Sequence, residues 1–339
     1  MALQASGTIK YSQIIAEFGT PNNGGLGEFR LGGGENVGSL TNLPLDTGVP
    51  VSGEIKFSDF YSKKLNHVVD LHSIPNNSIR QNAKDRWNNG NVHIVGSTKT
   101  SKSQPPDTIE DRVIINVNVS IGSTNGAGTN NHCALRTGNW DTDTTLEIEI
   151  GTSGGLFGAG GDGGEGGDSS GGNGTDGGVG SSAIGIEYPC TINNLGVIRA
   201  GYGGGGGGDG ETRTTGGGKK SGSTTNGSSG GGGGGGAGFP FGLGGATAGG
   251  SAGGGAAGSD GDDGSATTSG TGGAGGSSAG DGGDGGVVDN SSTKAEDGGN
   301  SGGIGGDNGY AIITNQGSSP ALTGGGTLTG RVLTSTNPT

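Results

Sequence analysis

The chain has little from which to build an ordinary hydrophobic core. Hydrophobic residues make up 26% of its 339 residues and aromatic residues 4%, too little for one conventional core of that size. No segment approaches the ~20 apolar residues that span a membrane. The opening MALQASGTIK lacks the apolar stretch of a secretion signal. We therefore predict neither a large globular core nor insertion into a membrane.

Basic residues and cysteines are also scarce. Lys and Arg number 18 against 31 Asp and Glu, a net charge of −13, and such an acidic surface repels nucleic acid. Nucleic acid is therefore not an expected partner. Cys133 and Cys190 are the two cysteines. A reduced pair is the default for a chain made in a cytoplasm, and the sequence leaves open whether they form a disulfide.

The sequence contains no complete pattern for metal or cofactor chemistry. Its four histidines are His67, His72, His93 and His132, and they lack the spacing of metal ligands. Residues 171–176 and 302–307 match the first half of a calcium-binding nonapeptide, but Gly178 and Gly309 occupy its required apolar position. Calcium between neighbouring acidic rows stays an alternative. We expect no cofactor, no metal site and no enzymatic activity.

Glycine is abundant, with 89 residues against a usual share of about 7%. In GAGGDGGEGGD at 158–168, two glycines and one other residue repeat, with Asp162, Glu165 and Asp168 in the third position. This period suits an extended threefold helix of the polyproline II type, whose backbone groups need outside partners. Glycine-rich sequence is otherwise typical of flexible linkers, but strict phase and great length favour packed polyglycine II helices with the acids in one solvent-facing row.

Shorter repeats organise the rest of the chain. SGTIKYS at 6–12 returns as SGEIKFS at 52–58. Each copy continues into a helix-like run, from Ser12 to Gly19 and from Ser58 to Asn66, that its serine can cap. We expect two copies of one small strand-plus-helix unit, too small to stand alone and docked on a partner.

Strand-like segments lie between these units and the glycine tracts. Residues 111–123 and 144–151 alternate apolar and polar side chains, which predicts strands with one buried face. GLFGAG (155–160) and GVIRAG (196–201) share one form and lead into polyglycine. A weaker third copy results when 192–205 is laid on 313–326.

The predicted fold class is mainly β and irregular, with small strand-plus-helix N-terminal units, a β-rich middle and a C-terminal sandwich of packed polyglycine II helices. The predicted domains are duplicated attachment units at 1–66, a connector at 67–110, a β-strand region at 111–150, the polyglycine II sandwich with variable loops at 151–309, and a C-terminal strand and tail at 310–339.

LEIEIGTSGGLFGAGGDGG and CTINNLGVIRAGYGGGGGG resemble glycine-rich motifs of the receptor-binding adhesins at tail-fibre tips of T-even-type phages. SGTIKYSQI and SGEIKFSDFY are similar to units that open tail and fibre proteins of large tailed phages. The resemblance implies layered polyglycine II helices with variable loops that touch the host surface. It also implies a location in the virion, other tail or fibre proteins as partners, and a host glycan or outer-membrane protein as receptor.

Three functions remain in competition. The leading hypothesis is a virion adhesin that binds a host receptor through loops on a rigid glycine scaffold. The alternative is a purely structural virion protein, such as a fibre, baseplate or capsid decoration protein. An ice-binding protein is the third, but it needs a flat, regular face, whereas loops interrupt these glycine tracts.

The loops between glycine tracts hold the candidate receptor-binding residues. These candidates are Arg213, Lys219, Lys220, Phe239, Phe241, Asp262, Asp263 and Lys294. The loop 209–229 combines three bases with many hydroxyl side chains, which suits contact with a glycan or a receptor loop. The two phenylalanines can be read equally as aromatic anchors or as caps on the bundle end. The plainer interpretation of the other loops is that they are solvated turns.

Overall fold

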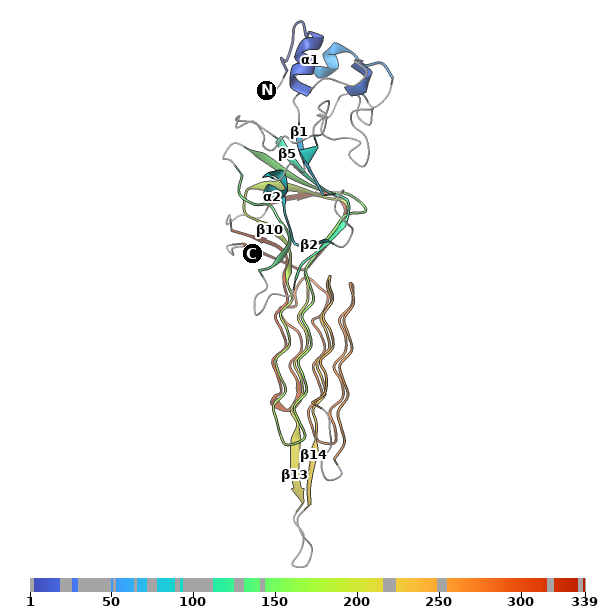
Figure 1. Ribbon diagram of the computed structural model, residues 1–339, viewed down its shortest axis with the longest axis vertical. Helices are drawn as coiled ribbons and strands as arrows, with labels where there is room; N and C mark the ends of the chain where they lie inside the picture. The colour runs from blue at the N-terminus through green and yellow to red at the C-terminus, as the bar shows by residue number, and fades with distance from the viewer. Residues whose placement is uncertain are drawn as a thin grey trace, which may run out of the picture.

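The computed structural model describes residues 3–18, 26–29, 50, 53–63, 66–71, 78–88, 92–93, 112–124, 131–140, 144–215, 224–248, 255–315, 320–334 and 338. The protein is mainly β, with 8% helix, 27% strand and parallel sheets, which confirms the predicted fold class at this level. Figure 1 shows a small helical unit at the N-terminal end, a β-structured body and a long narrow shaft that ends at the β13–β14 hairpin.

The N-terminal unit has a small core of its own. Its elements are α1 (Tyr11–Phe18), η1 (Leu26–Phe29) and η2 (Phe57–Phe60). Ile9, Ile14 and Phe60 are buried together. The predicted helix-like run from Ser58 to Asn66 is wrong in extent, because η2 ends at Phe60 and a turn follows at Tyr61 and Ser62, where Ser62 has a φ of +58°. Its next residues exchange backbone hydrogen bonds with the N-terminal segment, from Leu3 N–H to Lys63 and from Ser62 N–H to Gln4.

The two copies of the N-terminal repeat share local geometry. Gly7 and Gly53 both have a positive φ, +94° and +77°, which glycine adopts without strain. Three residues after each glycine, the backbone N–H of a lysine donates to the side chain three residues further on. The pairs are Lys10 to Gln13 and Lys56 to Asp59, each at 2.7 Å. The fixed offset in the sequence therefore reflects one repeated turn.

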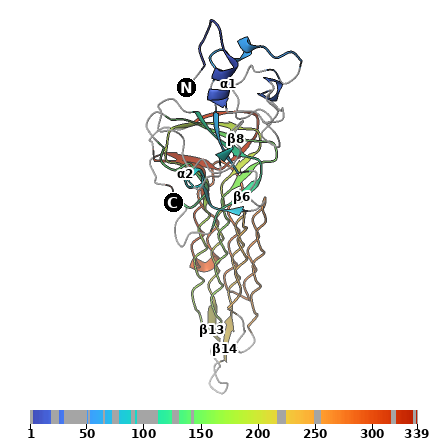
Figure 2. The same cartoon turned by 45° about the horizontal axis from the view of Figure 1, so that its top comes forward.

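Strands from distant parts of the chain form three sheets in the body (Figure 2). The first contains β16 (Ala321–Thr323), β11 (Cys190–Asn194), β8 (Thr145–Ile150), β5 (Arg112–Val117), β1 (Asn66–Asp70) and the antiparallel edge strand β4 (Val92–His93). The second contains β18 (Arg331–Thr334), β15 (Tyr310–Thr314), β10 (Ser182–Ile186), β7 (Cys133–Arg136) and β3 (Gln81–Asn82), which leads into α2 (Ala83–Asn88). The third contains β17 (Thr327–Thr329), β12 (Val197–Arg199), β9 (Gly155–Phe157), β6 (Ser120–Gly122) and β2 (Ser78–Ile79).

All three sheets stack their parallel strands in the same chain order, so the chain visits each sheet once per turn. This arrangement is a triangular parallel β-helix. Buried aliphatic side chains line up from turn to turn. The three ladders are Val69–Ile115–Ile148–Ile192, Ile121–Leu156–Ile198 and Leu135–Ile184–Ile312. Parallel sheets covered on their inner face favour such branched residues, and each buried side chain contributes roughly 1.5–3 kcal/mol.

The β-helix explains the repeat before the glycine tracts. GLFGAG and GVIRAG lie on successive turns, where Leu156 pairs with Ile198. The third copy of the repeat, predicted by laying 192–205 on 313–326, is in the wrong register. Ile198 pairs with Leu328 on the next turn, which lies outside the predicted range. That alignment matched glycines that have different roles. Gly324, with a φ of +92°, follows β16 and lies at a corner of the β-helix rather than in a glycine tract.

The shaft is an insertion at one corner of the β-helix. The first and last turns cross this corner with a single residue, Arg80 between β2 and β3 and Gly330 between β17 and β18, both with positive φ. Two of the turns between them, those of β9 to β10 and of β12 to β15, leave the β-helix here and return after residues 158–181 and 200–309. Consequently, one compact body anchors both glycine-rich excursions.

Within the shaft, every third N–H of a tract points to the same neighbouring tract. Gly158, Gly161, Gly164 and Gly167 donate to the carbonyl oxygens of Arg199, Tyr202, Gly205 and Gly208 at 2.8–2.9 Å. Gly160, Gly163 and Gly166 donate to Pro240, Leu243 and Ala246 at 2.8–3.0 Å. The carbonyl oxygens of the same tract accept hydrogen bonds from two further tracts, 172–181 and 229–239. The tracts are therefore joined sideways in several directions rather than in the plane of a sheet.

Close approach of backbone to backbone explains the glycines. A Cβ added at Gly163 would lie 1.9 Å from the carbonyl oxygen of Gly233, and one at Gly164 would lie 2.0 Å from that of Thr175. Both glycines of the repeat thus face a neighbouring tract, while Asp162 and Glu165 are exposed. A side chain at either glycine position would have to push two tracts apart.

Candidate functional site

Side chains gather at the far end of the shaft, on the hairpin of β13 (Glu211–Thr215) and β14 (Thr224–Ser228). The two strands pair with Glu211 opposite Ser228 and Arg213 opposite Asn226. Alternation along the strands puts these four polar residues on one face.

The opposite face of the hairpin is anchored on the turn that follows tract 158–168. The Thr212 hydroxyl donates to the carbonyl oxygen of Ser169 at 3.3 Å, and a Cβ at Gly227 would lie 1.9 Å from the same oxygen. The Ser170 hydroxyl and the N–H groups of Ser170 and Gly172 hold the pKa of Asp168 below its ordinary value. This hydrogen-bonded turn supports the hairpin from below.

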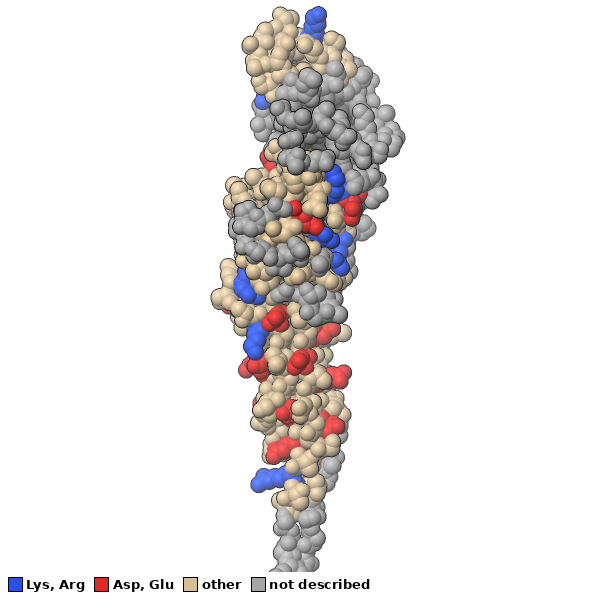
Figure 3. Space-filling model, turned by 90° about the vertical axis from the view of Figure 1, so that its left-hand side faces the viewer, with Lys and Arg blue, Asp and Glu red and all other residues tan. Residues whose placement is uncertain are grey.

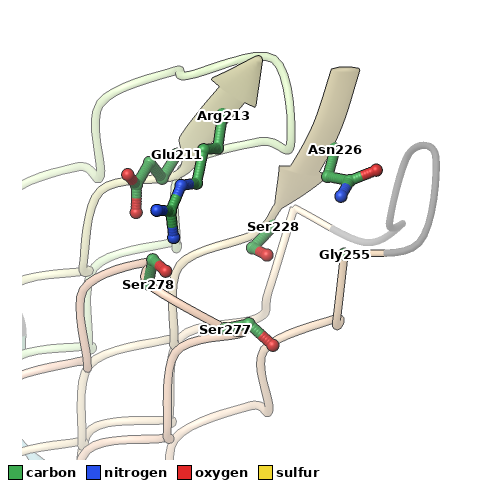
Figure 4. Close-up of a pocket in the computed structure, with 7 residues that line it drawn as sticks. All are labelled: Glu211, Arg213, Asn226, Ser228, Gly255, Ser277 and Ser278. Carbon is green, nitrogen blue, oxygen red and sulfur yellow. The ribbon is translucent and has the colours of Figure 1, made fainter. Parts of the chain in front are cut away.

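The polar face lines a hollow of about 140 Å³ (Figure 4). Its walls are Glu211, Arg213, Asn226, Ser228, Gly255, Ser277 and Ser278. Arg213 and the two serines of the 277–278 turn are exposed, whereas Ser228 is buried. The Oδ1 atom of Asn226 is buried and accepts no hydrogen bond from any described residue. Ser278 has a φ of +71°, an uncommon conformation for a residue other than glycine.

The acidic residues along the shaft have a structural role that the sequence did not reveal. Figure 3 shows Asp and Glu side chains spaced along one face of the shaft. Many of these carboxylates accept a hydrogen bond from a backbone N–H of the adjacent tract. The donors and acceptors are Leu243 to Asp162, Ile304 to Asp176, Gly174 to Asp209, Thr247 to Asp260, Gly244 to Asp263, Gly275 to Asp281, Gly272 to Asp284 and Gly305 to Asp297, at 2.7–2.9 Å. We call these contacts carboxylate staples.

The staples satisfy backbone N–H groups that donate to no carbonyl oxygen of a described residue in a neighbouring tract. Tract 240–247 illustrates the rule. Gly242 and Gly245 donate to carbonyl oxygens of tract 229–239, Leu243 donates to Asp162, and Gly244 donates to Asp263. The acidic third positions therefore complete the backbone hydrogen bonding of the shaft.

Three of the predicted receptor-binding residues have partners within the shaft. Asp263 is a staple, and Asp262 accepts a hydrogen bond from the Thr271 hydroxyl. Lys294 forms an ion pair with Asp297 at 2.6 Å. These side chains are exposed but already have partners within the shaft.

Phe239 and Phe241 lie where the shaft meets the β-helix, not at the tip. The Phe239 ring contacts the Phe157 ring edge-to-face, with 6.4 Å between centroids. Its backbone bonds to both parts, donating to Gly158 and accepting from Ser123. Phe241 is 43% exposed. For Phe239 this geometry fits the interpretation as a cap on the bundle end.

The structure does not bring the predicted candidates together. Arg213 lies in the hollow at the tip, whereas the phenylalanines lie at the junction with the β-helix. Lys219 and Lys220 fall outside the described residues. The sequence analysis missed Asn226, Ser277 and Ser278, because nothing in it indicates that the 277–278 turn meets the hairpin.

Other features of the described residues offer no site for metal chemistry. They contain no group of three or more His, Cys, Asp or Glu that could hold a metal ion, and no helix among them is long and apolar enough to cross a membrane. Cys133 and Cys190 are not joined. Burial raises the pKa of the Cys190 thiol to about 12, so that thiol stays protonated and unreactive at neutral pH.

Comparison with known protein-family models, with curated proteins and with solved structures found no match to this chain.

Proposed function

We propose that this chain is a phage tail-fibre or tail-tip adhesin that binds a host-surface receptor with the tip of its shaft. The observation that carries this proposal is a contrast between the shaft, which is packed through its backbone, and the tip, which presents polar side chains. Along the shaft, glycine backbones face each other, and most of the polar third residues are engaged with a neighbouring tract. At the tip, a hairpin presents Glu211, Arg213 and Asn226 around a hollow.

We also propose that the tracts are polyglycine II helices packed as a sandwich. Hydrogen bonding to several neighbouring tracts with a period of three residues supports this assignment, because polyproline II geometry has three residues per turn and no internal bonds. A bundle joined by so many lateral bonds is a stiff spacer. It would hold the tip away from the β-helix and from the particle that carries it.

The proposed partners lie at opposite ends of the molecule. We assign residues 1–66 to docking on another tail or fibre protein, because their core consists of a few residues around Ile14 and Phe60. The host partner is a surface glycan or an outer-membrane protein. The role is one of binding rather than catalysis, without nucleic acid or membrane insertion, in a virion assembled from protein made in the host cytoplasm.

A purely structural virion protein remains the second candidate. The rigid shaft and the N-terminal unit would serve a fibre or a baseplate equally well. The two functions differ in what the tip must do, since a structural protein requires no recognition there.

Exchange of the loop 209–229, or replacement of Arg213, Lys219 and Lys220 by Ser, tests the adhesin. We expect particles that carry the altered chain to assemble normally and to lose adsorption to host cells. Truncation of 1–66 is the matching control, which should abolish incorporation into particles while the shaft stays folded. Unchanged adsorption and host range after the loop exchange would favour the structural protein.

A further inference from the structure

We propose that the hollow at the shaft tip binds a neutral sugar unit of a surface glycan. The proposal rests on the adhesin function and specifies its ligand. It follows from the chemistry of the walls, which combine hydrogen-bond acceptors, hydrogen-bond donors and hydroxyl groups that can do both within a small area. Glu211 accepts, Arg213 donates, and the Ser277 and Ser278 hydroxyls do both.

A sugar presents the complement of this set. Each of its hydroxyl groups is donor and acceptor at once, so neighbouring hydroxyls can bridge Glu211 and Arg213. The Asn226 side-chain amide adds a further hydrogen-bonding group to the wall of the hollow.

Charge and lining argue against other ligand classes. Glu211 and Arg213 balance each other within the hollow, while Asp209 precedes β13 and Asp281 is stapled to Gly275 near the 277–278 turn. The lining of the hollow thus carries no excess of positive charge that would select an anionic ligand. No aromatic or large aliphatic side chain lines the hollow, so the anchors that usually dominate peptide recognition have no pocket here.

The fixed geometry of the walls favours binding of a small ligand. The hairpin is held from behind by Thr212 and Gly227. On the other wall, the Asn300 side chain donates to the Ser278 carbonyl oxygen at 3.0 Å. Groups held in place before binding lose less conformational entropy when the ligand arrives. Figure 4 shows both walls with their polar side chains on the hollow.

Saturation-transfer NMR on the full chain tests this proposal. The probes are the methyl glycosides of glucose, galactose, mannose and N-acetylglucosamine. We expect at least one of them to bind with millimolar affinity. Glu211→Ala or Arg213→Ala should weaken that affinity at least tenfold, since a hydrogen bond to a charged group contributes about 1.5–3 kcal/mol. Thr214→Ala, on the opposite face of β13, is the matched control and should change it less than twofold.

Adsorption of the chain to host cells distinguishes a wrong sugar proposal from a wrong adhesin proposal. Periodate, which cleaves vicinal diols, should abolish binding of the wild-type chain, whereas protease treatment of the cells should not. Protease-sensitive, periodate-resistant binding would overturn the sugar proposal while the adhesin stands, and the ligand would then be a protein. Absence of binding to all four glycosides would overturn it as well. A wild-type chain that adsorbs to no host cell would instead contradict the adhesin function.

Discussion

The carboxylate staples predict that Asp162 stabilises the shaft through its acceptor oxygen rather than through its charge in solvent. Asp162→Ala leaves the Leu243 N–H without its partner at 2.8 Å. Glu165 stands three residues further along the same exposed row, and its carboxylate accepts no hydrogen bond from any described residue. Glu165→Ala is therefore a control that removes the same charge from the same face.

The expected magnitude follows from the exposure of the staple. A hydrogen bond to a charged group contributes about 1.5–3 kcal/mol when it is buried, but water can reach the Leu243 N–H once Asp162 is shortened. We therefore expect the loss to be about 1 kcal/mol for opening of tract 240–247, a factor of about 5 in the population of open states. Asp162→Asn keeps an acceptor oxygen in place and should lose less than half of this.

Hydrogen exchange measured by mass spectrometry on the full chain can follow this local opening. Peptides that cover 240–247 should exchange about fivefold faster in Asp162→Ala and at nearly the wild-type rate in Glu165→Ala. The global unfolding transition should shift little, because one staple acts on one tract. If both alanine variants exchanged at the same rate, the carboxylate would act only as a surface charge and the staple would have no energetic meaning.

Three further predictions concern the glycines, the acid response and the insertion. Gly163→Ala should destabilise the shaft at the upper end of the overpacking range of roughly 1–3 kcal/mol, whereas Gly325→Ala, whose Cβ would meet nothing within 4 Å, should be silent in thermal unfolding. Hydrogen bonds from Lys294 and then from Gly305 lower the pKa of Asp297 below 3.8. The stability from Asp297 should thus be present above that pH and lost as pH falls through the lowered pKa, a titration visible in the Gly305 amide NMR signal and absent in Asp297→Asn. Replacing 158–181 and 200–309 by one glycine each should leave a folded β-helix with a cooperative melt and a monomeric elution volume, and an aggregated product would refute the corner insertion.

The local repeats of the N-terminal units could be predicted from the sequence because they encode local geometry. Gly7 and Gly53 mark the same turn, and the lysine three residues later makes the same side-chain contact in each copy. The glycine period likewise predicted two inward positions and one outward position, which Gly163, Gly164 and Asp162 occupy.

The β-helix could not be predicted, because its turns are interrupted. β12 ends at Arg199 and the same turn resumes at Tyr310, beyond the whole second excursion. Strands as short as β9 and β12 carry too few residues to show a period of two. Their partners are fixed by stacking of Leu156 on Ile198, two residues that the first excursion, 158–181, separates in the sequence.

The tip site was hidden for a related reason. Arg213 stands out in the sequence because it is a base in an acidic region, but its neighbours in the hollow, Ser277 and Ser278, belong to a turn that any solvated loop would match. They meet only because successive tracts run up and down the shaft and reverse at the same end. The lateral hydrogen bonds hold that alignment, since each glycine N–H fixes one tract against the next. Because no side chains fit between the glycine tracts, the turns that join successive tracts are the places where the sequence can vary its side chains. The proposed recognition at the tip therefore follows from how the shaft is packed.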